Sequence, residues 1–445
     1  MMQWQQLLIR QRLGKNNQIN SESVRTCFQR DYDRLVFSSP FRRLKDKTQV
    51  YSLPENDYLR TRLIHSIEVS CVGRSLGTIV GNEIIQRHNL KDYNPSDFGD
   101  IVSAASLAHD IGNPPFGHAG EYAIQSGFKN WFATAQISLN KTQETDFNLF
   151  EGNAQGFRII SNLEMQPREG GMQLTCPTLA AFAKYPRESY IPEDILNSYQ
   201  GKSIAKYNFF QAEKELFAEV AQTVGLIRRN NQVAWWARHP LAFLMEAADD
   251  ICYLIVDVED GCRMRYIPFA DAKKLLNAIA QRSEADIKAQ TNTEESQIKY
   301  LRARAISKLV KEVADIFLLK EPEMLRGEFD TELLALSQYA SVLEDIRCET
   351  KIKVIKHPDV VSTRIAGHEI LVQLFKEFAD AVLSKGDKAE FLKQMIPQQY
   401  LFGDRGSIAE REDSYSKILQ VTDFISGMTD SYATNLFKKL KGISL

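Results

Sequence analysis

The sequence predicts an all-α protein, and three observations lead to that prediction. Apolar residues recur at intervals of three and four in the long segments, the spacing that places them on one face of a helix. Alternation of apolar and polar residues, which would predict strands, does not recur along the chain. No glycine-rich phosphate loop follows a predicted strand, so neither a dinucleotide-binding fold nor a P-loop fold is expected.

The earlier helices are predicted from their apolar faces. Residues 69–80 carry Val69, Val72, Leu76, Ile79 and Val80 at helical spacing. Residues 241–255 repeat the pattern after Pro240, a residue well suited to a first helical turn. The stretch from about 130 to 205 is richer in Asn, Gln, Gly and Pro, and we expect loops and short helices there.

Two further segments, about 205–227 and about 286–318, are also predicted to be helices, the second with a strongly charged face. A short strand remains open, for instance around Lys351–Ile355. From about residue 283 the composition turns polar and charged, and the remainder of the chain is expected to form a second helical lobe. The sequence contains no internal repeat and no low-complexity tail.

Composition bounds the class of protein. The chain has 445 residues, of which 44% are hydrophobic and 25% charged, with a formal net charge of −2. Because single cores stop growing at about 250–300 residues, we expect a large domain with an appended lobe. The small net charge argues against a surface devoted to nucleic acid, and any anion site must be local.

The sequence gives no indication of secretion or membrane insertion. The segment Met1–Lys15 has too short an apolar run for a secretory signal, and no uncharged apolar run reaches the length of about 18 residues that would predict a membrane span. The six cysteines form no CxxC pair and are expected to be reduced, mostly buried thiols. These features predict a cytoplasmic protein that does not contact a membrane.

The segment 108–115, AHDIGNPP, is the first candidate for chemistry. An apolar run predicts a helix whose last turn carries His109 and Asp110, and Gly112 with the two prolines ends that helix. An adjacent imidazole and carboxylate can bind one divalent cation together if other elements supply further ligands. The alternative at this point is a satisfied surface pair.

Two more segments offer such ligands. His65 lies in an amphipathic helix one turn after Arg62, on the same face, which suits a cation that binds a phosphate beside a metal. Asp249, Tyr253 and Asp257 are spaced i, i+4, i+8 and form one stripe on a mostly apolar helix, where a carboxylate needs a partner or a metal. A core histidine, and aspartates that face water, are the alternatives.

Taken in chain order, His … His-Asp … Asp on helices resembles the HD phosphohydrolase superfamily. The motifs RTRLIHS, AHDIGNPPFGHAGE, EGNAQG, KYP and ADDICYLIVDVEDG together look like the bacterial deoxyguanosine triphosphate triphosphohydrolases, the dGTPase family. The resemblance spans about residues 30–265 and afterwards rests mainly on residues 364–367, RIAG. It implies an HD-domain helical core, residues 1–265, and an additional helical lobe, residues 266–445, that completes the site and makes oligomer contacts.

The resemblance implies one divalent metal ion per subunit. Its ligands would be His65, His109, Asp110 and Asp249. Mixed nitrogen and oxygen ligands suit Mn²⁺, Fe²⁺, Co²⁺ or Ni²⁺ better than an all-oxygen Mg²⁺ site, although Mg²⁺ remains compatible with help from phosphate oxygens. Asp249 is preferred to Asp250 because Tyr253 and Asp257 lie on its face.

The resemblance also implies roles for the remaining motif residues. His118 and Glu121 would transfer protons, since a histidine oriented by a carboxylate can activate water or protonate a leaving 5′-oxygen. Gln49 would contact the deoxyribose, Tyr253 would stack under the sugar where a 2′-hydroxyl would clash, and Asp257 would accept from the 3′-hydroxyl. The triphosphate would be bound by Arg62, Lys184, Tyr185 and Arg364.

The implied activity is hydrolysis of a deoxynucleoside triphosphate, with dGTP favoured, to deoxynucleoside and tripolyphosphate. A homo-oligomer, with a hexamer favoured, and a dNTP or single-stranded DNA effector are expected on the same ground. One alternative is another HD phosphohydrolase, such as a phosphodiesterase or an alarmone hydrolase, but no motif attaches the remaining histidines to a second metal. The other is a non-catalytic nucleotide-binding or single-strand-binding regulator, which the intact ligand set weighs against.

Overall fold

The computed structural model describes residues 1–15, 25–49, 60–165, 168–401 and 413–443, and over these ranges it contains helices but no β-sheet. Only isolated bridges, such as Arg187 with Trp235, join extended segments. The predicted all-α fold is therefore confirmed. Among the described residues, no helix combines the length and apolar character needed to cross a membrane.

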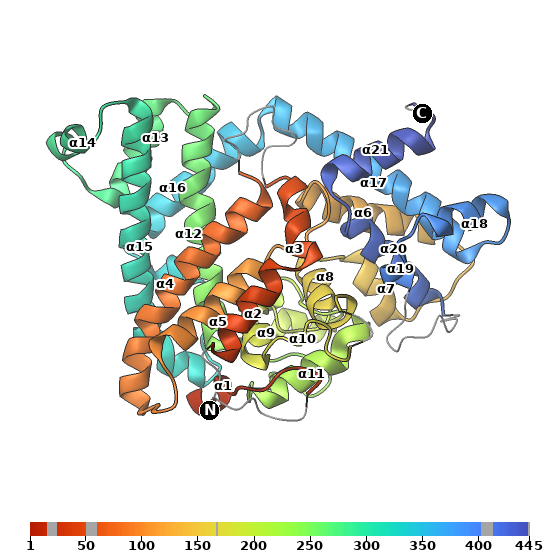
Figure 1. Ribbon diagram of the computed structural model, residues 1–445, viewed down its shortest axis with the longest axis horizontal. Coiled ribbons are helices and arrows are strands. Elements are labelled where there is room, and N and C mark those ends of the chain that lie inside the picture. Colours follow the sequence, from red (N-terminus) through yellow and green to blue (C-terminus); the bar gives the residue numbers. More distant parts are fainter. Residues whose placement is uncertain (16–24, 50–59, 166–167, 402–412, 444–445) are drawn as a thin grey trace.

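The centre of the fold is an antiparallel pair of helices, α4 (Arg62–His88) and α5 (Pro95–Ala108). The pair packs closely because small residues face each other, and a Cβ on Gly77 would lie 2.6 Å from the Phe98 carbonyl oxygen. Asn89 ends α4 in the left-handed conformation, with φ of 52°, and the chain turns back at once into α5. The first turn of α4 therefore lies beside the end of α5 (Figure 1).

Helix α12 (Pro240–Arg263) packs against both of these helices and against α15 (Glu294–Leu325). His239 caps α12 by accepting a hydrogen bond from the Leu241 N–H, and Pro240 occupies the first turn, as predicted. The predicted helix over 241–255 is confirmed as part of α12. A large hydrophobic core forms between these helices together with α2 (Cys27–Val36), α9 (Cys176–Phe182), α13 (Phe269–Ala280) and α16 (Ala340–Thr350).

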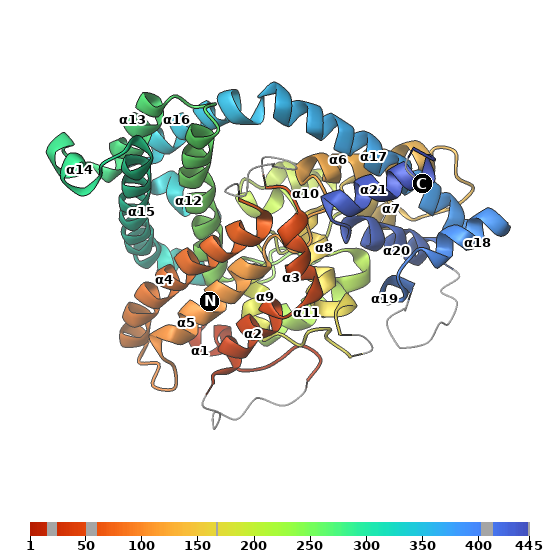
Figure 2. The ribbon, with the colours of Figure 1, turned by 45° about the horizontal axis from the view of Figure 1, so that its top comes forward.

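A second hydrophobic core lies on the other side of the molecule. It contains residues of α6 (His118–Phe132), α7 (Lys141–Asn148), α17 (Pro358–Leu383), α18 (Asp387–Gln394), α20 (Ser414–Ser426) and α21 (Asp430–Leu440). Helix α17 runs from the α16 side of the fold to the α18 side in both views (Figures 1 and 2). The two cores do not follow chain order, and the boundary at residue 265 stays a prediction.

The shorter elements complete the chain. They are α1 (Trp4–Leu7), α3 (Ser39–Arg43), η1 (Leu44–Asp46), α8 (Gly152–Arg158), η2 (Ile159–Leu163), α10 (Glu193–Ser198), η3 (Lys202–Ile204), η4 (Gln211–Glu213), α11 (Lys214–Thr223), α14 (Glu284–Gln290), η5 (Leu333–Leu336), η6 (Lys351–Ile355) and α19 (Gln398–Leu401). All six cysteines are unbonded, and three of them, Cys27, Cys176 and Cys252, are buried, fewer than expected.

Three local predictions need correction. The helix expected over 205–227 is confined to Lys214–Thr223 with a 3₁₀ turn before it. The helix expected over 286–318 is interrupted because Thr293 accepts a hydrogen bond from the Ser296 N–H and starts α15 as a new helix. A strand at Lys351–Ile355 is wrong, because this segment continues α16 as a π-helix, closed by a hydrogen bond from the Lys356 N–H to the Lys351 carbonyl.

Candidate active site

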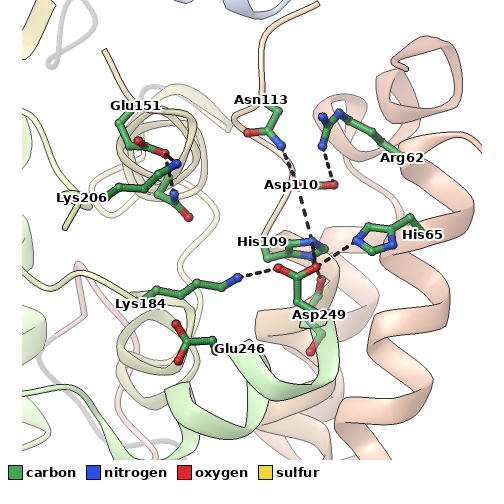
Figure 3. A network of polar contacts seen from close by, with 12 residues as sticks. Arg62, His65, His109, Asp110, Asn113, Glu151, Lys184, Lys206, Glu246 and Asp249 are labelled. Carbon is green, nitrogen blue, oxygen red and sulfur yellow. Dashed lines mark hydrogen bonds and ion pairs between the residues drawn. The ribbon is translucent and has the colours of Figure 1, made fainter. Parts of the chain in front are cut away.

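Three predicted metal ligands come together at the junction of α4, α5 and α12. One donor atom from each of His65, His109 and Asp249 lies within 4.8 Å of the other two. Asp249 Oδ1 is 3.1 Å from His65 Nε2 and 3.4 Å from His109 Nε2. Figure 3 shows both imidazoles turned toward this carboxylate. Within the described residues this is the one group of three or more such side chains with metal-ligand spacing.

The orientation of His109 suits metal binding. Its Nδ1 lies 2.6 Å from the Ser106 carbonyl oxygen. Because a carbonyl can only accept, Nδ1 carries the hydrogen and Nε2 is left with a lone pair that points into the group. Two imidazole nitrogens and a carboxylate oxygen form a donor set that fits a divalent transition metal, so the residues present fit the expected ion.

Asp110 lies at the edge of this group. Helix α5 ends at Ala108, so His109 is the cap and Asp110 belongs to the following turn, one step beyond the predicted last helical turn. Asp110 Oδ1 is 3.6 Å from His109 Nε2, and Oδ2 accepts a hydrogen bond of 2.7 Å from Arg62. Burial alone would raise the pKa of Asp110, but Arg62 and the two histidines lower it to about 2.

Lys184 brings a positive charge to the same carboxylate. Its Nζ donates a hydrogen bond of 2.6 Å to Asp249 Oδ2. Burial disfavours the charged form of both groups. The charge of Lys184 and the contacts with the two histidines nevertheless keep the pKa of Asp249 well below its ordinary value. Burial raises the pKa of neighbouring Asp250, helped by Glu246 and Asp249, and Asp250 is absent from the three-residue group.

Glycines explain why AHDIGNPP and EGNAQG occur together. A Cβ on Gly112 would lie 2.0 Å from the Gly156 nitrogen and 2.2 Å from the Gly152 oxygen. A Cβ on Gly152 would lie 2.2 Å from the Asn113 side-chain oxygen. The turn after His109 and helix α8 therefore approach each other backbone to backbone, which only glycine permits at these positions.

His118 and Glu121 form a pair at the start of α6. His118 Nδ1 lies 2.6 Å from Glu121 Oε2, and Glu121 Oε1 accepts a hydrogen bond of 2.8 Å from the Gly152 N–H. The His118 side chain is 70% exposed while that of Glu121 is 7% exposed, so a buried carboxylate orients an accessible imidazole. Burial raises the pKa of Glu121, but the hydrogen bond and charge of His118 outweigh burial and lower it.

The structure adds residues to which the sequence assigned no role. Lys206 Nζ donates to Glu151 Oε1 at 3.0 Å, and both face the Lys184 side of the site (Figure 3). Asn113 donates to Asp110 through its side-chain amide. Glu151 lies in the motif EGNAQG and Asn113 in AHDIGNPP, so both could have been found from the sequence. Lys206 belongs to no recognised motif.

The predicted nucleotide-binding residues occupy several parts of this region. Tyr253 and Asp257 lie on α12 as expected, and Asp257 is buried with no hydrogen-bond partner for Oδ2 among the described residues. Arg364 lies on α17, close enough for its charge to lower the pKa of Tyr253, which burial nevertheless raises to about 12. Tyr185 is held by a hydrogen bond from its N–H to Asn208, and Gln49 is described with its Oε1 buried.

A surface cavity of about 440 Å³ lies beside the catalytic candidate His118. Helix α6 contributes His118 and Tyr122 to its lining, and α17 contributes Arg364 and His368. The structure therefore brings one predicted phosphate-binding residue, Arg364, into the same cavity as His118. Lys184 and Arg62 lie instead at the three-ligand group.

Comparison with known proteins decides the family. The HD domain model matches residues 62–165, and the phosphohydrolase-associated domain model matches residues 337–439. A deoxyguanosinetriphosphate triphosphohydrolase-like protein of Synechocystis sp. is 55% identical over the full length of both chains. The chain belongs to the deoxyguanosinetriphosphate triphosphohydrolase-like family. A deoxyguanosinetriphosphate triphosphohydrolase-like protein of Pseudomonas aeruginosa is 38% identical over all of this chain. The deoxyguanosinetriphosphate triphosphohydrolase of Salmonella paratyphi A is 29% identical over 94% of this chain.

Membership in the deoxyguanosinetriphosphate triphosphohydrolase-like family confirms the resemblance found in the sequence. It makes the chain an HD-domain phosphohydrolase, a class that binds a divalent metal. The HD match contains His65, His109 and Asp110 as well as the His118–Glu121 pair. Asp249 lies between the two matched ranges and Arg364 lies in the second, so the candidate site draws on the whole chain.

Proposed function

We propose that this protein hydrolyses deoxynucleoside triphosphates, with dGTP preferred, to deoxynucleoside and tripolyphosphate. The observation that carries the proposal is that Arg62 donates a hydrogen bond to Asp110 and Lys184 donates one to Asp249. Both cations thus lie beside the proposed metal ligands. A buried guanidinium and a half-buried ammonium there suit a substrate with several phosphate charges. The names of the relatives supply dGTP as the preferred substrate.

The proposed metal ligands would place a divalent ion beside the α-phosphate. His65, His109, Asp110 and Asp249 are the proposed ligands, and a bound divalent ion would supply Lewis-acid stabilisation of the charge that develops on a phosphate oxygen. Arg62 and Lys184 neutralise the carboxylates in the described arrangement and would turn to the phosphates of a bound nucleotide. Lys206, beside buried Glu151, adds a third cation on the Lys184 side.

His118 and Glu121 are the proposed proton-transfer pair. Glu121 accepts from His118 Nδ1, so the imidazole presents Nε2 to the accessible side. Water forms the new bond to the α-phosphorus, and the bond from that phosphorus to the 5′-oxygen breaks. His118, with a hydrogen on each ring nitrogen, delivers the Nε2 proton to the departing 5′-oxygen, so the deoxynucleoside leaves neutral and the three phosphates leave together. The attacking water keeps one hydrogen on the new phosphate oxygen and releases the other to solvent, from which His118 regains its proton.

Tyr253, Asp257 and Gln49 are proposed to select the deoxyribose. The buried Asp257 carboxyl group offers a hydroxyl donor an oxygen that has no partner within the described part of the chain, and Tyr253 precedes it by one helical turn on α12. We propose that the aromatic face leaves no room for a 2′-hydroxyl. GTP should therefore be a poorer substrate than dGTP at equal concentration, and equal specificity constants would rule out this role.

Product analysis tests the proposed activity against its alternatives. Purified protein is incubated with each dNTP and Mn²⁺, with and without a second dNTP or single-stranded DNA. Equal amounts of deoxynucleoside and tripolyphosphate are expected. Pyrophosphate with a monophosphate would indicate another HD phosphohydrolase, and nucleotide binding without any product under all conditions would indicate a regulator.

A further inference from the structure

The turn that leads into His118 has an unfavourable backbone. Phe116 has φ of 61° and Gly117 has φ of 59°. Glycine adopts this left-handed conformation readily, but a bulky aromatic residue does so only where its surroundings impose it. Gly117 is the cap of α6, and His118 is the first residue of that helix. The conformation at Phe116 therefore fixes where the His118 side chain begins.

Asp430 of α21 contacts this turn directly. The carboxylate is only 1% exposed, and Oδ1 accepts a hydrogen bond of 3.0 Å from the Phe116 N–H. Oδ2 accepts from the Thr48 N–H at 3.0 Å and from the Thr48 hydroxyl. One buried side chain from the last described helix thus joins the segment before Gln49 to the turn before His118.

Two further contacts connect the same turn to the C-terminal helices. Lys47 Nζ donates to the Asn113 carbonyl at 2.6 Å and to the carbonyl of Ser426, the last residue of α20, at 2.8 Å. On α17, a Cβ added to Gly367 would lie 2.4 Å from the Phe116 ring. Helices α17 and α21 therefore contact the seven residues between Asp110 and His118 directly, and α20 is joined to them through Lys47.

We propose that Asp430 is a positioning residue for the reaction, acting through the Phe116 N–H to hold the turn that presents His118. The matched phosphohydrolase-associated range contains Asp430, Ser426 and Gly367, while the turn lies in the HD range. The C-terminal region thereby sets the geometry of the proton-transfer pair. The effect on turnover rests on the proposed function, whereas the effect on the turn does not.

The separation of contacts predicts a specific kinetic signature. His65, His109 and Asp249 lie on α4, at the end of α5 and on α12, whereas Asp430 bonds to Phe116 and Thr48. Asp110, the fourth proposed ligand, accepts from Arg62 at the start of α4. Asp430→Ala should therefore retain bound metal and lower kcat on the order of 10²-fold, the loss typical of a misplacement of about 1 Å. Asp413→Ala is the matched control, because Asp413 caps α20 in the same region without touching the turn, and its kcat should stay within about twofold of the parent.

A double variant distinguishes positioning from a general loss of stability. If Asp430 acts through His118, then the Asp430→Ala change should lower kcat little further in a His118→Ala background. A purely structural role would lower kcat by the same factor in both backgrounds and would overturn the proposal. If Asp430→Ala does not fold, Gly367→Ala displaces the Phe116 ring with Asp430 intact, and it should give the same loss of kcat with metal retained.

Hydrogen exchange tests the turn without any activity. The peptide covering residues 111–119 should exchange faster in Asp430→Ala than in the parent, while α12 exchanges at the parent rate. Unchanged exchange over 111–119 would overturn the proposal even if the parent enzyme is active. Faster exchange in Asp430→Ala, together with a parent protein that yields no tripolyphosphate, would support the positioning of the turn and reject the proposed function alone.

Discussion

Asp249 contacts three of the side chains that define the candidate site. One carboxylate oxygen faces the two imidazoles of His65 and His109, and the other accepts from Lys184. Asp250, one residue later, has no such surroundings, and burial raises its pKa instead. Metal binding should therefore distinguish two adjacent residues of the same type.

Asp249→Ala is expected to remove most bound divalent metal, while Asp250→Ala retains it. The loss should exceed the about 10–100-fold typical of changing a partner outside the ligand set, because a ligand itself is removed. Metal analysis of the purified variants measures this. A full equivalent of metal in Asp249→Ala, with loss in Asp250→Ala, would show that Asp250 and not Asp249 is the ligand.

His118→Ala should separate chemistry from metal binding. The imidazole bonds to Glu121 and lies outside the three-ligand group, so metal content should stay at the parent level while kcat falls about 10²–10⁴-fold. Glu121→Ala should be milder, and the double variant scarcely worse than His118→Ala, since the two act as one unit. Losses that multiply in the double variant would assign them separate roles. His88→Ala is the control. His88 lies at the far end of α4 and contacts Glu321 of α15.

At the scale of residues, the sequence singled out side chains that belong to a motif. The family resemblance implied that His65, His109 and Asp249 form one group, and their side chains do lie together in the structure. Lys206 could not be singled out in this way, because its contact with Glu151 joins residues 55 positions apart and depends on how η3 and α8 are placed. Asp430 was invisible for the same reason, as it meets Phe116 across 314 positions.

At the scale of elements, the glycines of the motifs determine how closely helices and turns approach. Gly112 faces the backbone of Gly152 and Gly156, and neither can move away as a flexible side chain could. The sequence indicated Gly112 only as a helix stop. Its second role, contact with α8, depended on a segment about 40 residues later and was not readable from local pattern.

Gly112→Ala is expected to destabilise the protein by about 1–3 kcal/mol, the range for overpacking a tight interior position. Gly127→Ala is the matched control, because the added Cβ would lie 3.2 Å from a Phe375 side-chain atom, which leaves more room than at Gly112. Replacing glycine by alanine inside α6 also stabilises the helix by up to about 1 kcal/mol. Urea unfolding of the two variants compares them. Equal stabilities would contradict the close approach of the turn and α8.

Helix ends were harder to predict than helices. The core faces of α4 and α12 were visible because their apolar spacing extends over several turns. The break between α14 and α15 depends on one cap at Thr293, and the π-helix at Lys351–Ile355 depends on continuation from α16. The β-branched residues of that segment favour a strand by propensity, but tertiary context overrides propensity there.

At the scale of the whole molecule, buried polar contacts link segments that are distant in the chain. Asp146, at the end of α7, is fully buried and accepts hydrogen bonds from Tyr415 on α20 and from the Gln211 N–H. Burial raises its pKa from 3.8 to about 7, against the lowering effect of these bonds. The folded protein therefore binds a proton at Asp146 more tightly than the unfolded chain does.

This pKa predicts a defined pH dependence of stability. A carboxyl whose folded pKa is raised contributes stability that is complete below pH 3.8 and is lost as pH rises through about 7. At about 1.36 kcal/mol for each pKa unit, the loss is on the order of 4 kcal/mol. Urea unfolding between pH 4 and pH 8 should show a smaller decrease in Asp146→Asn than in the parent. The exposed Asp345→Asn variant should keep the parent slope, and an unchanged slope in Asp146→Asn would contradict the assignment.

The proposed function requires that the protein cleaves the bond between the α-phosphorus and the 5′-oxygen of a deoxynucleoside triphosphate. One turnover of dGTP with Mn²⁺ in ¹⁸O-labelled water, followed by mass spectrometry of both products, tests it most directly. We expect one ¹⁸O in tripolyphosphate and none in deoxyguanosine, with no turnover in Asp249→Ala. Label in deoxyguanosine, or release of pyrophosphate with deoxyguanosine monophosphate, would contradict it.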